Sequence, residues 1–153
     1  MKKRRMLTIS VISLALLTLL YIMSPYQIIK VQGDSMTPTL EHNDWAVIKK
    51  TKNITRDDIV VMSSKRLNNG SDDYIIKRIK GIEGDTITIK DFTLTINNET
   101  WQLNDYIDPE TYTMQKDYMF VLGDNHNESL DSKNIGPLPK NIVQGKIVFP
   151  LYD

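Results

Sequence analysis

An uncharged, apolar stretch near the N-terminus constrains the fold more than any other feature. No charged residue occurs from Met6 to Ile29, and four basic residues, Lys2 to Arg5, come before the stretch. Its densest part, Leu7 to Ser24, extends about 27 Å as a helix with a rise of about 1.5 Å per residue, which is close to the apolar thickness of a bilayer. The sequence therefore predicts a transmembrane helix over residues 6–25.

The basic residues also predict the orientation of this helix. They favour a short cytoplasmic N-terminus, residues 1–5, and an extracytoplasmic domain, residues 26–153, at the cell membrane. A cleavable signal peptide is the alternative, because it too joins basic residues to an apolar segment. The stretch is longer than the usual apolar region of about 7 to 15 residues, and no Ala-x-Ala site follows it. These two features favour an uncleaved, single-pass anchor.

Composition limits the chemistry of the remaining chain. Of 153 residues, roughly 120 to 130 follow the anchor, which is enough for one domain with a core. Acidic and basic residues number 19 each, so no excess of positive charge indicates a nucleic-acid partner. The lack of cysteine excludes disulfides and thiolate chemistry, and two histidines are too few for a usual zinc cluster.

Short runs rich in Ile, Val and Thr follow Pro25 and are separated by Asn, Asp and Gly, a pattern typical of strands and tight turns. Thr86 to Ile89 and Phe92 to Ile96 alternate polar and apolar residues, as half-buried antiparallel strands do. Asn97-Asn98 predicts a hairpin turn, and Asn69-Gly70 another turn. The sequence therefore predicts a mostly β fold, with one antiparallel β domain behind the anchor.

Nine strands and two short helical turns are expected. The helical turns are predicted at Ser35 to Glu41 and at Leu138 to Val143. The strands are predicted at Tyr26 to Gln32, Asp44 to Lys49, Asp58 to Met62, Asp73 to Lys80, Thr86 to Lys90, Thr93 to Ile96, Thr100 to Gln102, Tyr118 to Leu122 and Ile142 to Phe149. Trp45 falls in the second of these strands, and we expect it in the core.

Ser35 and Lys77 are the candidate catalytic residues. A serine hydroxyl needs a base to remove its proton, and a lysine can act as that base only when it is neutral. Lys77 lies in a predicted strand with Ile75 and Ile79 on the same face, so apolar burial there favours a lowered pKa. The alternative is a lysine that passes its apolar neighbours to reach water. Ser35 alone also fits an ordinary turn, but Gly33 permits the backbone angles of an exposed nucleophile loop.

A third polar segment runs from Leu122 to Gly136. By composition it is a loop after a strand, and its oxygen ligands do not have the spacing of an EF-hand calcium loop. Within it, Asp131 and Lys133 are expected to form an ion pair, and Ser129 or Ser132 to orient a neutral lysine.

These three segments, in this order behind an N-terminal anchor, resemble the type I signal peptidases, the membrane-anchored Ser/Lys proteases that remove signal peptides from exported preproteins. Ser35 to Leu40 resembles the nucleophile segment, Lys77 to Asp85 the base segment, and Gly123 to Gly136 the last conserved segment of the family. The resemblance covers nearly the whole chain. The short chain with one anchor is similar to the Gram-positive branch.

The resemblance implies roles for individual residues. Ser35 is the acylating nucleophile, with its backbone N–H in the oxyanion hole, and Lys77 is the general base. Ser129 hydrogen-bonds the lysine, Asp131 and Lys133 pair structurally, and Arg78 supports the strand that carries the base. Some family members add an oxyanion-hole hydroxyl two residues before the nucleophile, where this chain has Gly33, so the second donor is open.

The resemblance also implies that no metal or organic cofactor is needed, and it implies the partners. These are the lipid bilayer and the signal peptides of secreted preproteins, with small residues at the minus-one and minus-three positions. Three alternatives remain open at this stage: a tethered, catalytically silent β module that binds exported chains, a self-cleaving Ser/Lys protease, and a peptidase with one dedicated substrate. The anchor, and the lack of a helix-turn-helix region, disfavour the self-cleaving protease.

Overall fold

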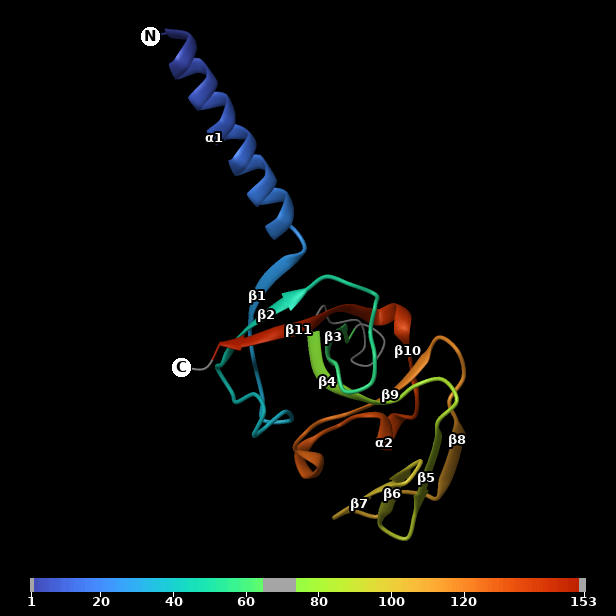
Figure 1. Ribbon diagram of the computed structural model, residues 1–153. Coiled ribbons are helices and arrows are strands. Elements are labelled where there is room, and N and C mark those ends of the chain that lie inside the picture. The colour runs from blue at the N-terminus through green and yellow to red at the C-terminus, as the bar shows by residue number, and fades with distance from the viewer. Residues whose placement is uncertain (1, 65–73, 152–153) are drawn as a thin grey trace.

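The computed structural model describes residues 2–64 and 74–151, and the chain within it divides into one helix and a β domain. Helix α1 (Lys2–Met23) projects away from the domain (Figure 1), and its described apolar side chains are exposed. Among the described residues, no helix combines the length and the apolar character that crossing a membrane requires. The transmembrane helix therefore stays a prediction.

The β domain consists of two antiparallel sheets. In the seven-stranded sheet the strands follow the order β1-β2-β11-β3-β4-β9-β10, and in the four-stranded sheet β7-β6-β5-β8. The first sheet contains β1 (Tyr26–Lys30), β2 (Trp45–Lys49), β3 (Ile59–Ser63), β4 (Tyr74–Gly81), β9 (Tyr118–Leu122), β10 (Leu138–Pro139) and β11 (Val143–Leu151). The second contains β5 (Thr86–Lys90), β6 (Thr93–Ile96), β7 (Glu99–Gln102) and β8 (Glu110–Thr113). The predicted antiparallel β fold is confirmed.

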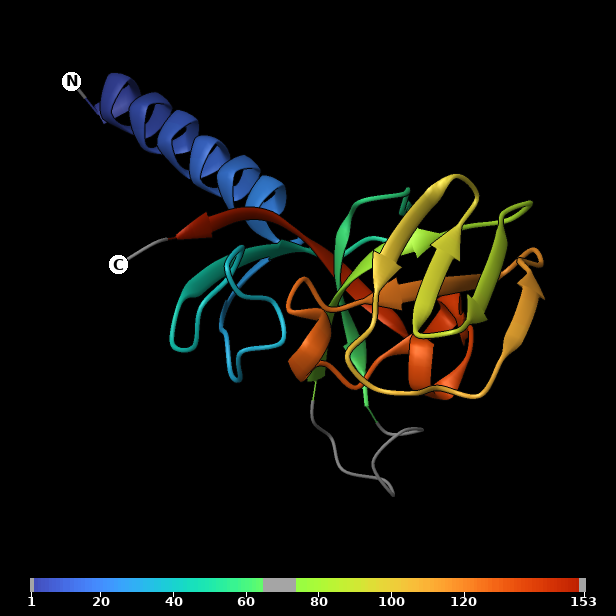
Figure 2. The same ribbon diagram turned by 90° about the horizontal axis from the view of Figure 1, so that it is seen from below.

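The four-stranded sheet lies at the end of the domain away from α1, as both views show (Figures 1 and 2). Its strands alternate buried apolar with more exposed polar positions, so one face packs inward and the other faces water. The buried face packs against Phe120 and Leu122 of β9. Strand β9 therefore joins the two sheets.

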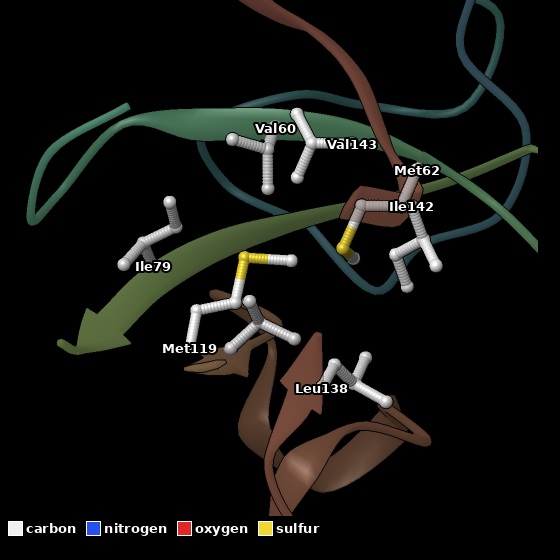
Figure 3. Close-up of a cluster of buried hydrophobic side chains, with 8 residues drawn as sticks. Val60, Met62, Ile79, Met119, Leu138, Ile142 and Val143 are labelled. Atoms are coloured by element: carbon white, nitrogen blue, oxygen red, sulfur yellow. The ribbon is translucent and has the colours of Figure 1, made fainter. Parts of the chain in front are cut away.

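The core under the seven-stranded sheet is a tightly packed aliphatic and methionine cluster (Figure 3). Its members are Val60, Met62, Ile79, Met119, Val121, Leu138, Ile142 and Val143. A smaller cluster of Val31, Met36, Leu40 and Ala46 packs beneath the loop that follows β1. This smaller cluster fixes the segment that contains Ser35.

Several local predictions differ from the structure. Residues 35–40 form turns and not a helix, and the segment from Leu138 is divided between β10 and the 3₁₀ turn η2 (Lys140–Ile142). Strand β8 and the short helix α2 (Ser132–Ile135) were not predicted. The prediction of a buried Trp45 is wrong, because 43% of the residue is exposed and its ring lies beside the Lys30 ammonium. The predicted turn at Asn69-Gly70 lies outside the described residues.

Candidate active site

Ser35 and Lys77 come together at the junction of β4 and the loop after β1. The Nζ atom of Lys77 lies 2.7 Å from the Oγ atom of Ser35, within hydrogen-bond distance. Lys77 is only 5% exposed and lies on β4. Two residues separated by 42 positions in the sequence thus form the contact that a serine nucleophile and a lysine base need.

Burial changes the proton affinity of this lysine. Desolvation lowers the pKa of Lys77 from its ordinary value of 10.5, because the protein interior disfavours the charged ammonium. The negative charge of Asp131 opposes this effect, and the positive charge of Lys133 adds to it. The net direction is downward, toward the neutral form that can accept the Ser35 proton.

Gly123, at the end of β9, allows the loop of Ser35 to approach closely. A Cβ atom at this position would lie 2.4 Å from the Ser35 carbonyl oxygen and 2.3 Å from the Ser129 Oγ atom, so a side chain has no room. The next residues hold the same loop, because the backbone N–H of Asn125 donates to the Ser35 carbonyl at 3.0 Å. The Asn125 side chain also donates to the carbonyl of Asp34.

Arg78, Asp124 and Thr39 connect the strand of Lys77 to the two loops. The Nε and Nη2 atoms of Arg78 donate to the two carboxylate oxygens of Asp124 at 2.8 and 2.6 Å, a bidentate pairing. The Thr39 hydroxyl donates to Asp124 at 2.5 Å. Arg78 also donates to the carbonyl of Asp57. The arrangement fits the expected supporting role of Arg78, with a carboxylate partner that sequence reasoning did not identify.

Loss of the Asp124 carboxylate should make the protein less stable in a pH-dependent way. Burial alone raises the pKa of Asp124, but hydrogen bonds from Arg78 and Thr39 outweigh it and hold that pKa below 3.8. A carboxylate whose pKa is lower in the folded state than in the unfolded state stabilises the fold at pH values above its unfolded-state pKa. This stabilisation is lost as the pH falls through the folded-state pKa. We therefore expect Asp124→Asn to lower the free energy of unfolding by about 1–3 kcal/mol at neutral pH.

Urea unfolding of both proteins between pH 7 and pH 2 checks this expectation. The difference in unfolding free energy should shrink as the pH falls below about 4, where the native carboxylate also becomes protonated. A difference that stays constant over this range would show that Asp124 does not act through its charge.

The segment after Asn125 holds Asp131 and Lys133 as a buried pair. The Lys133 Nζ atom lies 3.1 Å from Asp131 Oδ2 and 2.5 Å from the Ser129 carbonyl oxygen. Asp131 also accepts the Gly123 N–H at 2.9 Å and caps the N-terminus of α2. The pairing predicted for these two side chains is present in the structure, and it braces the strand end beside the Ser35 loop.

Ser129 is placed differently from the expectation. Its Oγ atom is buried next to Gly123 but has no hydrogen-bond partner among the described residues, so the expected bond to Lys77 is not formed. The lysine instead contacts Ser35. Ser132, the other serine considered for orienting the lysine, accepts the Val121 backbone N–H at 3.0 Å.

The loop before Ser35 is pinned from a third side. Gly33 adopts a φ of +82°, and its N–H donates to the Nδ1 atom of His42 at 3.0 Å. This donor is therefore engaged within the protein. Among the described residues, no group of three or more His, Cys, Asp or Glu side chains forms a metal site.

A cleft of about 590 Å³ leads to Ser35 and Lys77. The cleft runs between β1 and the first half of β4. Among the described strands, β1 pairs only with β2, so its other edge has no partner. Strand β9 pairs with β4 only from Arg78 onward, so the edge of β4 before Arg78 also has no partner among the described strands. Its lining residues are Gln27, Ile29, Lys30, Val31, Gln32, Gly33, Ser35, Met36, Ile48, Lys50, Val61, Tyr74, Ile75, Ile76, Lys77 and Gln144. Two free strand edges can hold an extended peptide by main-chain hydrogen bonds.

The chain has the features expected of a serine peptidase. These are an antiparallel β domain, a buried lysine that contacts a serine hydroxyl, and a cleft large enough for a peptide. Comparison with known families agrees. The family model described as "Signal peptidase, peptidase S26" matches residues 3–152, and the chain belongs to this family. It is of the type I signal peptidase kind, as the sequence resemblance predicts.

Relatives come from bacteria and from a plant. The chain is 32% identical over 159 residues to signal peptidase I P of Bacillus subtilis subsp. natto, covering 91% of this chain and 82% of that protein. It is 34% identical over 135 residues to thylakoidal processing peptidase 1 of Arabidopsis thaliana, covering 78% of this chain. The chain spans only 40% of the length of that plant relative and 36% of a second one. A crystal structure of a signal peptidase I from Enterococcus faecalis V583 is 26% identical, with a TM-score of 0.46 over 61% of this chain and 96% of that one.

Proposed function

We propose that this chain is a membrane-bound serine endopeptidase that removes N-terminal signal peptides from exported preproteins. The observation that carries the proposal is the 2.7 Å contact between Lys77 Nζ and Ser35 Oγ at the end of the cleft. Membership of the signal peptidase family supports the choice of substrate.

The proposed mechanism is acyl transfer in two steps. Neutral Lys77 removes the Ser35 proton while Oγ attacks the scissile carbonyl, and the Ser35 backbone N–H stabilises the oxyanion. The protonated lysine then gives its proton to the departing amine of the mature protein. In the second step Lys77 activates a water molecule, which hydrolyses the ester and releases the signal peptide from Ser35.

Four further residues position this pair. Arg78 holds the strand of Lys77 to Asp124, and the pair of Asp131 and Lys133 braces the end of β9. The Ser129 hydroxyl lies beside Gly123 and has no partner among the described residues, and in this proposal it bonds Lys77 when the lysine moves off Ser35 during the reaction. In this proposal none of the four touches the scissile bond.

The substrate lies extended in the cleft, between the free edges of β1 and β4. Small side chains at the minus-one and minus-three positions are part of the proposal, as the resemblance to the family implies. The cleft holds Ile29, Ile76 and Met36 near the dyad, an apolar lining that suits alanine-sized groups.

Membrane attachment is the part of the proposal that rests on the sequence. The uncharged residues 6–29 and the basic residues before them favour a single-pass anchor, with the N-terminus in the cytoplasm and the β domain outside. The described apolar side chains of α1 are exposed and are not covered by the β domain. Their exposure supports the proposal that lipid surrounds the helix.

Cleavage of a preprotein by the purified chain in detergent tests the function. We expect one cut after a small-x-small triplet, identified by sequencing the new N-terminus. If several preproteins stay intact with a folded chain, the function is instead that of a non-catalytic module that binds exported chains, or of a peptidase with a dedicated substrate.

The pH dependence of cleavage tests the role of Lys77. Only the neutral amine accepts a proton, so kcat/KM should rise with pH through the lowered pKa of Lys77 and level off above it. The midpoint should lie clearly below 10.5, the ordinary value for lysine. Initial rates on a short peptide substrate between pH 5 and 11 give this profile, and a midpoint at the ordinary value would contradict a desolvated base.

A further inference from the structure

We propose that Lys50 makes the cleft select acidic residues, and reject basic ones, about four to six positions before the scissile bond of the substrate. The inference deepens the proposed function, on which it rests, by assigning a specificity to the far end of the same cleft.

Three lysines line the described part of the cleft, and of these only the Lys50 side chain has no partner among the residues that the structure describes. Lys77 is buried against Ser35, and the Lys30 ammonium lies beside the Trp45 ring, 5.9 Å from its centre. The Lys50 side chain has no hydrogen-bond or ion-pair partner among the described residues. No acidic side chain is present among the described residues that line the cleft, so none of these residues neutralises its charge.

The strand geometry directs Lys50 toward the cleft. Ile48 also lines the cleft, and side chains two residues apart project from the same face of an extended chain. Lys49 lies between them and faces the other way, with its ammonium 5.9 Å from the Tyr26 ring centre. Lys50 therefore lines the cleft and Lys49 does not, so Lys49 provides a matched control.

The position of Lys50 fixes its distance from the scissile bond. Its backbone N–H donates to the Pro25 carbonyl at 2.7 Å, which places it beside the start of β1. From Gln27 to Gly33 the chain advances about 20 Å at about 3.3 Å per residue. A substrate strand beside β1 therefore needs about six residues to reach from Ser35 to the start of β1, where Lys50 lies. Fewer residues are enough if the Lys50 side chain extends along the cleft toward Ser35.

The direction of the substrate follows from the position of α1. Strand β1 begins directly after this helix, so the Lys50 end of the cleft adjoins the helix and the Ser35 end lies further away (Figure 1). In the proposed function the apolar part of the substrate precedes the cleavage site and shares the bilayer with α1. The substrate therefore enters at the Lys50 end and runs parallel to β1 toward Ser35, with the residues before the scissile bond in the cleft.

The size of the effect follows from the exposure of the site. Lys50 is exposed, and exposed charge pairs interact weakly and are screened by salt. We expect kcat/KM to differ by about 3- to 10-fold between a substrate with glutamate and one with lysine at the same position. Raising the salt concentration to about 1 M should remove most of this difference.

The test uses preproteins with Glu, Gln or Lys at the minus-five position, cleaved by the full-length chain in uncharged detergent so that lipid charge plays no part. The native chain should prefer Glu over Gln over Lys, Lys50→Gln should lose this order, and Lys50→Glu should reverse it. Lys49→Gln removes the same charge from the adjacent residue and should keep the native order.

Three results would overturn the proposal, and they separate a failure of the inference from a failure of the proposed function. If the native chain cleaves all three substrates at equal rates, or if Lys49→Gln changes the order as much as Lys50→Gln does, the specificity is not set by Lys50 although the peptidase function stands. If none of the three substrates is cleaved, the proposed function fails and the inference fails with it.

Discussion

Alanine at position 35 is expected to leave a folded chain that cleaves preproteins at least about 10³-fold more slowly than the native one. The change removes the Oγ atom that lies 2.7 Å from Lys77 and leaves the backbone of the loop in place. The loop is held by Asn125, by His42 and by a buried cluster that includes Met36, none of which needs the hydroxyl. Initial cleavage rates together with a thermal unfolding curve measure both properties.

Lys77→Ala should reduce the rate by a similar factor, because it removes the basic side chain that hydrogen-bonds the Ser35 hydroxyl. Lys77→Arg should fail as well, since a guanidinium stays protonated and accepts no proton. Lys90→Ala is the control, a change of the same kind at a side chain that is 69% exposed and lies on the four-stranded sheet. Substantial activity in Ser35→Ala or in Lys77→Ala would remove the proposed dyad.

The second large effect is expected from Gly123→Ala. The added Cβ atom would lie 2.4 Å from the Ser35 carbonyl and 2.5 Å from the Cβ atom of Ser129, so one of the two segments must move. Since a misplacement of about 1 Å can cost about 100-fold in rate, we expect kcat to fall by about that factor. Overpacking of this kind also costs about 1–3 kcal/mol of stability. Steady-state kinetics and urea unfolding give the two numbers separately.

Gly84→Ala separates lost stability from lost geometry. Gly84 has a φ of +88°, so alanine is strained there too, but no atom lies within 4 Å of its added Cβ. This variant should lose stability and keep its kcat, whereas Gly123→Ala should lose both. Equal kcat values for the two variants would mean that the close approach at Gly123 does not hold Ser35 in place.

The fold was largely predictable because its strands carry strong local patterns. Strands β5 and β6 alternate threonine with Ile or Leu, and a period of two in buried residues specifies a half-buried strand. Strand β8 carries only Tyr112 as an apolar residue, and its other positions are polar, so its pairing with β5 sets its conformation. Trp45 was misplaced because β2 runs between β1 and β11, and the sequence does not show which of its faces is covered.

The candidate site was predictable in its residues and less so in its contacts. Apolar neighbours around Lys77 indicated burial, and the order of three segments indicated that Ser35 belongs with it. The bond of Arg78 to Asp124 joins residues 46 positions apart, for which no periodic signal exists. The Ser129 hydroxyl has no partner among the described residues and packs beside Gly123, a contact for which the sequence carries no periodic signal.

The most direct test of the central claim is to identify the atom that carries the acyl group. A preprotein is mixed with the native chain and quenched in acid within one turnover, and the chain is digested and analysed by mass spectrometry. We predict that the peptide containing Ser35 gains the acyl group of the signal peptide as an ester, which is the mass of the released signal peptide less one water, and that Ser35→Ala gains nothing. An acyl group on another residue, or cleavage without any acylated intermediate in the native chain, would contradict it.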